Sequence, residues 1–298
     1  MFTASVENAQ GESLILTGNE PRWQVFRITG LNPPKGQINL SEMAGMDGAW
    51  FNSSKLDVRN IVIYLKINGD AQTNRLTLYN YFKTKQKLTF FFEHSARSVY
   101  IEGYCETVQV SPFDRSQTMQ VSILCPFPYF RSVGGEIVPF GFSTALFEFP
   151  FSINEDDPIP FSEDDQYSVA TIINNSDEDV GMKVTIDNNY ANDGLRIVNI
   201  LTGEKFEVDY SFAVGDIVEI CTKTGEKTAK VTRSGVVTNL FAYIPIDSTF
   251  LQLHPGSNRI EVFAKTSGGS YWSQVGSTAI DKGWYNISFA FESLFRGV

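Results

Sequence analysis

The sequence has few of the residues on which catalytic and metal sites depend. Among its 298 residues are only three cysteines and two histidines. Cys105, Cys125 and Cys221 show no C-x-x-C spacing, which argues against a disulfide framework and against a zinc site. We expect them to be buried thiols of a protein that folds in a reducing compartment.

The sequence also has no long apolar run. No stretch reaches the roughly 18 apolar residues that a membrane-spanning helix needs. The N-terminus has no charged segment followed by an apolar core, so we expect neither export nor insertion into a membrane. Neither G-x-G-x-x-G after a strand nor G-x-x-x-x-G-K-[ST] occurs, which excludes the usual nucleotide-binding loops.

The candidate catalytic and metal-binding residues do not form a recognisable motif. A hydrolytic triad needs a histidine as general base, but neither His94 nor His254 stands near a nucleophile motif. The acidic clusters at 155–157, 163–165 and 177–179 lack the spacing of a calcium loop. Residues 187–194 come nearest to that spacing, but Ala191 occupies a ligand position. We therefore expect no enzymatic activity, no metal and no cofactor.

Charge is unevenly distributed along the sequence. Residues 1–131 contain 13 Lys/Arg and 11 Asp/Glu, a net charge of +2, whereas residues 132–298 contain 11 and 23, a net charge of −12. An acidic half repels phosphate, and no basic run offers the footprint of a nucleic-acid-binding protein. We expect no recognition of nucleic acid and no binding to anionic membranes.

Short segments rich in β-branched and aromatic residues dominate the sequence. Apolar residues make up 42% of it, with 24 Phe and 12 Tyr, which is enough for packed interiors. In the first half we predict strands at 13–17, 22–29, 58–67, 88–92, 98–110 and 116–124. One helix interrupts them: it starts near Asp70, and Leu76, Tyr79 and Phe82 recur on one face.

Residues 30–55 break the strand rhythm with a long loop or extended hairpin. A connection of about 25 residues is far longer than the usual ~4–6 and indicates a functional or a disordered segment. Met43, Met46, Trp50 and Phe51 are large apolar residues, which disorder would select against. We predict that they contact a partner; the alternative is that they pack onto their own domain.

Two prolines near residues 126–128 indicate a domain boundary. The expected domains are therefore 1–131 and 132–298. The second contains many short segments with strand character, among them 167–174, 181–187, 216–221, 228–232, 236–244 and 258–264. This spacing predicts a jelly-roll-like sandwich, so the fold class is all-β with two sandwich domains. Trp272 and Trp284 in this half are candidates for sugar stacking or for core packing.

Turn-rich stretches in the second half resemble the distal tail proteins of long-tailed bacteriophages that infect Gram-positive bacteria. They are residues 214–220 (VGDIVEI), 223–240 and 250–262 (FLQLHPGSNRIEV), together with the boundary at 125–129 and residues 293–298. The Gly-Asp and Pro-Gly-Ser-Asn steps in them are turn formers between strands. The first half matches the family in its organisation more than in distinctive residues.

The resemblance implies a structural role in the virion, at the tail tip or baseplate. It implies a ring, usually a hexamer, joined through the N-terminal domains, with galectin-like C-terminal domains outside. The implied partners are other copies of the chain, the tail tube protein, the tail-tip hub or tail-associated lysin protein and, in some phages, receptor-binding proteins. Assembly would take place in the host cytoplasm.

Two other functions stay open. A galectin-like domain could act as a carbohydrate-binding module that adheres to the host cell wall. A tail-tube subunit shares the expected N-terminal architecture, but it would polymerise into long tubes instead of discrete rings.

Overall fold

The chain folds into two compact units. The computed structural model describes residues 2–18, 20–45, 47–140, 142–145, 162–165, 169–266, 268, 271–275 and 285–298. Unit 1 comprises Met1–Val133 and Leu294–Val298, and unit 2 comprises Gly134–Ser293. Residues 294–298 thus belong to unit 1, whereas the predicted domain 132–298 included them in the second half.

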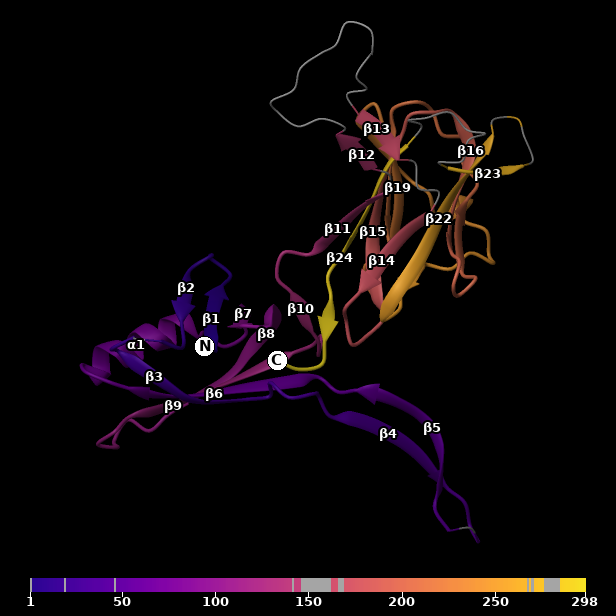
Figure 1. Ribbon diagram of the computed structural model, residues 1–298. Coiled ribbons are helices and arrows are strands. Elements are labelled where there is room, and N and C mark those ends of the chain that lie inside the picture. Colours follow the sequence, from indigo (N-terminus) through magenta and orange to yellow (C-terminus); the bar gives the residue numbers. More distant parts are fainter. Residues whose placement is uncertain are drawn as a thin grey trace, which may run out of the picture. The chain divides into compact units, whose positions relative to one another are not determined.

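Unit 1 consists of a large antiparallel sheet, a helix and a separate hairpin (Figure 1). The nine-stranded sheet has the order β2-β1-β7-β8-β9-β6-β3, and β10 pairs with both β8 and β25. The elements of unit 1 are β1 (Thr3–Asn8), β2 (Ser13–Ile15), β3 (Trp23–Thr29), β4 (Gly36–Glu42), β5 (Ala49–Leu56), β6 (Arg59–Ile67), α1 (Ala71–Tyr81), β7 (Lys87–His94), β8 (Arg97–Val110), β9 (Thr118–Cys125), β10 (Phe130–Ser132) and β25 (Leu294–Phe295).

Alternating side chains of the sheet build the core of unit 1. Every second residue of a strand points to the same face, and the inward positions of the central strands are buried: Ile61, Ile63, Leu65, Ile67, Leu88, Phe90, Phe92, Val99, Ile101, Met119, Val121 and Ile123. Trp23 at the start of β3 is 1% exposed, and its indole N–H donates to the Ile15 carbonyl oxygen at 3.4 Å. Side chains from both edges of the sheet therefore reach one core.

The predicted helix is present, but its buried face differs from the predicted one. Asp70 caps α1, since its carboxylate accepts from the Thr73 N–H at 3.3 Å. Leu78 and Phe82 are buried, whereas Leu76 is 57% exposed. The exposed Tyr79 also lies outside the core. No helix in the described part of the chain is long and apolar enough to cross a bilayer.

Unit 2 contains two larger antiparallel sheets and a short two-stranded one. The seven-stranded sheet has the order β11-β24-β15-β18-β19-β20 with β21 beside β15, and the five-stranded sheet has the order β14-β22-β16-β17 with β23 beside β22. Its elements are β11 (Glu136–Phe140), β12 (Phe142–Ala145), β13 (Ser162–Asp165), β14 (Val169–Asn174), β15 (Val180–Asn188), β16 (Asn192–Asn199), β17 (Lys205–Val208), β18 (Asp216–Cys221), β19 (Thr228–Arg233), β20 (Val236–Asn239), the 3-10 helix η1 (Phe241–Tyr243), β21 (Gln252–Leu253), β22 (Gly256–Thr266), β23 (Trp272–Gln274) and β24 (Tyr285–Phe291).

Both large sheets of unit 2 supply a face of buried apolar side chains. These include Met182, Val184, Ile186, Val218, Ile220, Phe289, Ile172, Ile197, Phe206, Ile260 and Val262. The strand predicted at 236–244 is wrong in its second half, where η1 replaces it. The Asn239 side-chain oxygen accepts from the Phe241 N–H at 2.9 Å, and this local turn ends the strand.

The cysteines are free thiols, two of which are buried. Cys105 and Cys125 lie in the core of unit 1, whereas Cys221 is half-buried. Burial raises the pKa of Cys105 to about 11 and that of Cys125 to about 12. Both thiols are therefore protonated at neutral pH and act as small core side chains.

Candidate functional site

The most unusual surface of unit 1 is the hairpin formed by β4 and β5, which we call the arm. Among the described residues its strands pair only with each other, from Gly36 opposite Leu56 to Glu42 opposite Ala49. Figure 1 shows this ribbon running away from the other strands of unit 1. An isolated two-stranded hairpin is only marginally stable in water. The arm is thus the part of unit 1 that is expected to gain most from a partner.

Polar contacts hold the two strands of the arm in register. At the root, the Asp57 N–H donates to the Lys35 carbonyl oxygen at 3.0 Å, and the Gln37 amide donates to the Asp57 carboxylate at 2.9 Å. Farther out, the Asn52 amide donates to the Ser41 hydroxyl at 2.6 Å. Gly45 has a φ of 86°, which suits a turn at the tip.

A β-bulge gives the arm one apolar face. The register shifts between Asn39 and Leu40, so that Leu40 lies opposite Phe51 while Ile38 lies opposite Ser54. A bulge reverses the alternation of one strand relative to its partner. Phe51 therefore lies on the same face as Ile38 and Leu40 instead of the opposite face.

Five large apolar side chains of the arm are more than half exposed. The exposed fractions are 65% for Ile38, 53% for Leu40, 51% for Met43, 60% for Trp50 and 63% for Phe51. Contiguous exposed apolar side chains mark interaction sites on folded proteins. Of the predicted residues, Met43, Trp50 and Phe51 all line the tip of the arm, but Trp50 lies opposite Ser41 and therefore on the other face from Phe51. Met46 lies outside the described residues.

The tip of the arm also forms a small pocket. It has a volume of about 200 Å³ and is lined by Met43, Asp47, Gly48, Ala49, Trp50 and Phe51. Ile38 and Leu40 add to the apolar surface, although neither was predicted from the sequence. Their spacing by two residues was the available signal, but the face they share with Phe51 depends on the bulge.

The second candidate site, the sugar-stacking tryptophans, is only partly described. The Arg196 guanidinium lies 4.1 Å from the centre of the Trp272 ring, a cation–π contact, and its Nε donates to the Glu207 carboxylate at 2.9 Å. Gly194 allows the indole to approach the backbone of β16, because a Cβ there would lie 3.0 Å from the ring. Trp272 is therefore a packed, half-buried side chain, and Trp284 lies outside the described residues.

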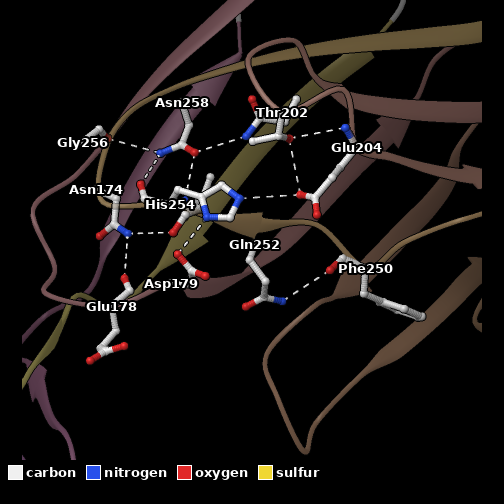
Figure 2. A network of polar contacts seen from close by, with 12 residues as sticks. Asn174, Glu178, Asp179, Thr202, Glu204, Phe250, Gln252, His254, Gly256 and Asn258 are labelled. Carbon is white, nitrogen blue, oxygen red and sulfur yellow. Dashed lines mark hydrogen bonds and ion pairs between the residues drawn. The ribbon is translucent and has the colours of Figure 1, made fainter. Parts of the chain in front are cut away.

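His254 belongs to a polar network that joins three turns of unit 2 (Figure 2). Its Nδ1 lies 2.8 Å from an Asp179 oxygen and its Nε2 lies 3.7 Å from a Glu204 oxygen. The side-chain oxygen of the buried Asn258 accepts from the backbone N–H of His254 at 3.0 Å. The side-chain amide of the buried Asn174 donates to the Leu253 carbonyl oxygen at 2.7 Å. The two carboxylates lie on opposite sides of the ring, so the network holds turns together.

No group of three or more His, Cys, Asp or Glu side chains among the described residues is arranged to hold a metal ion. His94 lies at a turn, where its Nδ1 accepts from the Ala96 N–H at 3.2 Å. Both histidines thus have local polar contacts that account for their positions.

Comparison with known proteins bears out the resemblance noted in the sequence. Residues 175–273, which are 99 of the 298, match the family model of the siphovirus-type tail component, C-terminal domain. The fold is similar to that of Dit (gp 19.1) of phage SPP1, described as a paradigm of the hub adsorption apparatus in phages that infect Gram-positive bacteria. The TM-score is 0.66 at 12% identity, over 99% of this chain and 99% of that chain.

Chains of the phage P2 baseplate in its activated conformation are also similar. The calcium form gives a TM-score of 0.47 at 11% identity, covering 98% of both chains. The strontium form gives 0.45 at 12% identity, covering 97% of this chain and 98% of that chain. No curated protein matches the sequence.

Proposed function

We propose that this protein is a structural component of a phage tail tip, of the distal tail type, and that its copies assemble into a ring. The observation that carries the ring is the arm, whose apolar face of Ile38, Leu40 and Phe51 is more than half exposed in the single chain. Six is the copy number that the family resemblance implies. The protein acts by assembly and not by catalysis.

The arm favours a head-to-tail contact between copies. A projecting ribbon on one side of a chain needs a different surface on its neighbour, which makes the interface heterologous. Repetition of such a contact closes into a ring when the rotation between copies allows it. Obligate interfaces of this kind bury ~2,000 Å² or more and are rich in apolar side chains.

The other partners follow from the place of a tail-tip ring. One side of it meets the tail tube protein and the other meets the tail-tip hub or tail-associated lysin protein. Receptor-binding proteins are candidates to dock on unit 2. The galectin-like character of unit 2 and the six-fold copy number stay predictions.

The carbohydrate-binding alternative was predicted for Trp272 and Trp284, of which only Trp272 lies among the described residues. A sugar stacks on an open ring face, but the Arg196 guanidinium already lies over this indole. The alternative would gain support if the protein bound host cell walls and Trp272→Ala abolished this binding without unfolding the chain.

The ring is tested by changing the arm. We expect negative-stain images of the wild-type protein to show discrete rings, and light scattering to give a multiple of the 33.4 kDa chain mass. Phe51→Asp places a charge on the apolar face and should weaken assembly at least ~30-fold, as loss of an interface hot spot does. Ile246→Asp is the matched control, because Ile246 is fully exposed but lies in unit 2.

Two results would contradict the proposal. One is a wild-type protein that stays a monomer at the concentrations reached in an infected cell. The other is a Phe51→Asp variant that assembles as well as the Ile246→Asp control. Long tubes in place of rings would instead identify a tail-tube subunit.

A further inference from the structure

The root of the arm is held by a buried arginine. Arg59 is the first residue of β6, three residues beyond the end of β5, and it is 3% exposed. Its Nη1 donates to the carbonyl oxygens of Gly30 (2.5 Å) and Asn32 (2.7 Å). Its Nε donates to Pro128 (2.7 Å) and its Nη2 to Arg296 (2.6 Å). All four acceptors are backbone carbonyls.

This arrangement is unusual for a buried charge. Buried arginines normally pair with a carboxylate, yet every hydrogen-bond acceptor of the Arg59 side chain in the described structure is a main-chain oxygen. The Phe130 ring lies 4.4 Å from the guanidinium carbon and adds a cation–π contact. Burial lowers the pKa of Arg59 to about 10, so the side chain remains charged at neutral pH.

The four carbonyls come from three separate segments of unit 1. Gly30 and Asn32 lead into the arm, Pro128 lies between β9 and β10, and Arg296 follows β25. Arg59 and Arg296 are 237 residues apart in sequence. All the hydrogen bonds of the guanidinium therefore form only when all three segments are in place. A backbone carbonyl moves only with its segment, so no side-chain rotation can replace it as an acceptor.

Segment 294–298 touches the arm root directly as well. The Val298 N–H donates to the Leu31 carbonyl oxygen at 3.2 Å. Gly297 lies so close that an added Cβ would be 3.2 Å from the same oxygen and 3.4 Å from the Pro33 ring. Arg97 also holds the segment, since its Nη1 donates to the Gly297 carbonyl oxygen at 3.2 Å.

We infer that Arg59 is the positioning residue of the arm: it sets the direction in which the ribbon leaves the sheet, and it does so only when segment 294–298 is docked. A two-stranded ribbon has no core of its own, so its direction is decided where it joins the sheet. That this direction matters for assembly rests on the proposed ring. Whether Arg59 keeps the arm root ordered does not depend on ring formation.

Hydrogen exchange on the wild-type protein and four variants tests the inference. Arg59→Lys keeps the charge but has no planar fork, and Arg59→Met keeps much of the volume without any donor. We expect the amides of Asp57 and Val298, which donate to the Lys35 and Leu31 carbonyl oxygens, to exchange at least ~10-fold faster in Arg59→Met. Arg59→Lys should lie in between, while the amides of β7 and β8 stay protected. Arg22→Met is the control, because Arg22 is an exposed partner of Glu20.

Gly297→Val guards against a variant that simply fails to fold. It leaves Arg59 unchanged but presses on the Leu31 carbonyl oxygen and the Pro33 ring, so we expect the same amides to exchange faster by a smaller factor. Unchanged exchange at the arm root in Arg59→Met would overturn the role of Arg59. Unchanged exchange in Gly297→Val would overturn the dependence on segment 294–298.

The exchange is measured at concentrations where the chain is a single copy, and ring formation is measured separately. A wild-type protein that forms no ring but shows faster arm-root exchange in the variants would contradict the proposed function and support this inference. Rings that form normally in Arg59→Met, despite a loosened root, would show that assembly does not need the positioned arm.

Discussion

The arm and strand β6 follow each other in the chain but have opposite surroundings. β6 carries Ile61, Ile63 and Leu65, all of which are 0% exposed, whereas Ile38 on the arm is 65% exposed. β6 has β9 on one side and β3 on the other, and its inward residues belong to the core of unit 1. In the part of the chain that the structure describes, β4 pairs only with β5. An alternating apolar pattern thus decides which way side chains point, and the neighbouring strands decide whether they are buried.

The largest difference between these regions should appear in the stability of the isolated chain. Phe92 on β7 is fully buried and lies edge-on to Phe130, with ring centres 5.7 Å apart. Phe92→Ala should lower the free energy of unfolding of unit 1 by ~3–5 kcal/mol, because the truncation leaves a cavity. Urea denaturation measures this. Phe91→Ala is the control, since Phe91 is the next residue but points to the other face.

If Phe92→Ala lowered the free energy of unfolding as little as the Phe91→Ala control, the sheet interior would be loosely packed. The contrast between core and arm would then lose its basis.

A buried charge extends the comparison to unit 2. Asp216 is 1% exposed; its Oδ2 lies 2.6 Å from Arg233 Nη2 and accepts from the Ala213 N–H at 2.8 Å. Burial alone would raise the pKa of Asp216, but the bonds from Arg233 and Ala213 outweigh it and lower the pKa below its usual value. Asp216→Asn should reduce stability at pH 7 by ~2 kcal/mol, as expected for hydrogen bonds to a charged group.

The direction of the pH dependence follows from that lowered pKa. The stabilisation is present above the ordinary Asp value of ~3.9 and is lost as the pH falls through the lower pKa of the folded state. The difference in Tm between wild type and Asp216→Asn should therefore shrink as the pH is lowered from 6 to 2.5. Glu42→Gln on the exposed arm is the control, and equal losses for both variants would contradict the role of the buried pair.

The sequence predicted the strands better than their partners. Alternation identified the central strands, and large apolar residues within an unusually long connection identified Met43, Trp50 and Phe51, because these features are local. The bulge that brings Ile38 and Leu40 onto the face of Phe51 is not visible in composition or spacing. The helix was predicted at the right place, but its buried face is set by tertiary contacts: the Tyr81 hydroxyl donates to the Val6 carbonyl oxygen at 2.5 Å.

Long-range polar contacts were the least predictable part of the molecule. No sequence motif distinguishes Arg59 from the other arginines. Its acceptors are main-chain oxygens from distant segments. A backbone carbonyl looks the same at every position of a sequence. Only the folded chain shows that four of them converge on one guanidinium.

The smallest expected effect is the one that separates the two interpretations of the arm. Phe51→Ser removes a ring that is 63% exposed, so the free energy of unfolding of the single chain should change by less than ~0.5 kcal/mol. Urea denaturation at a concentration below assembly measures it beside Phe92→Ala. A loss of ~2 kcal/mol or more would mean that the arm packs onto its own domain in solution. A negligible loss leaves its apolar face without an intramolecular role and therefore dependent on a second chain.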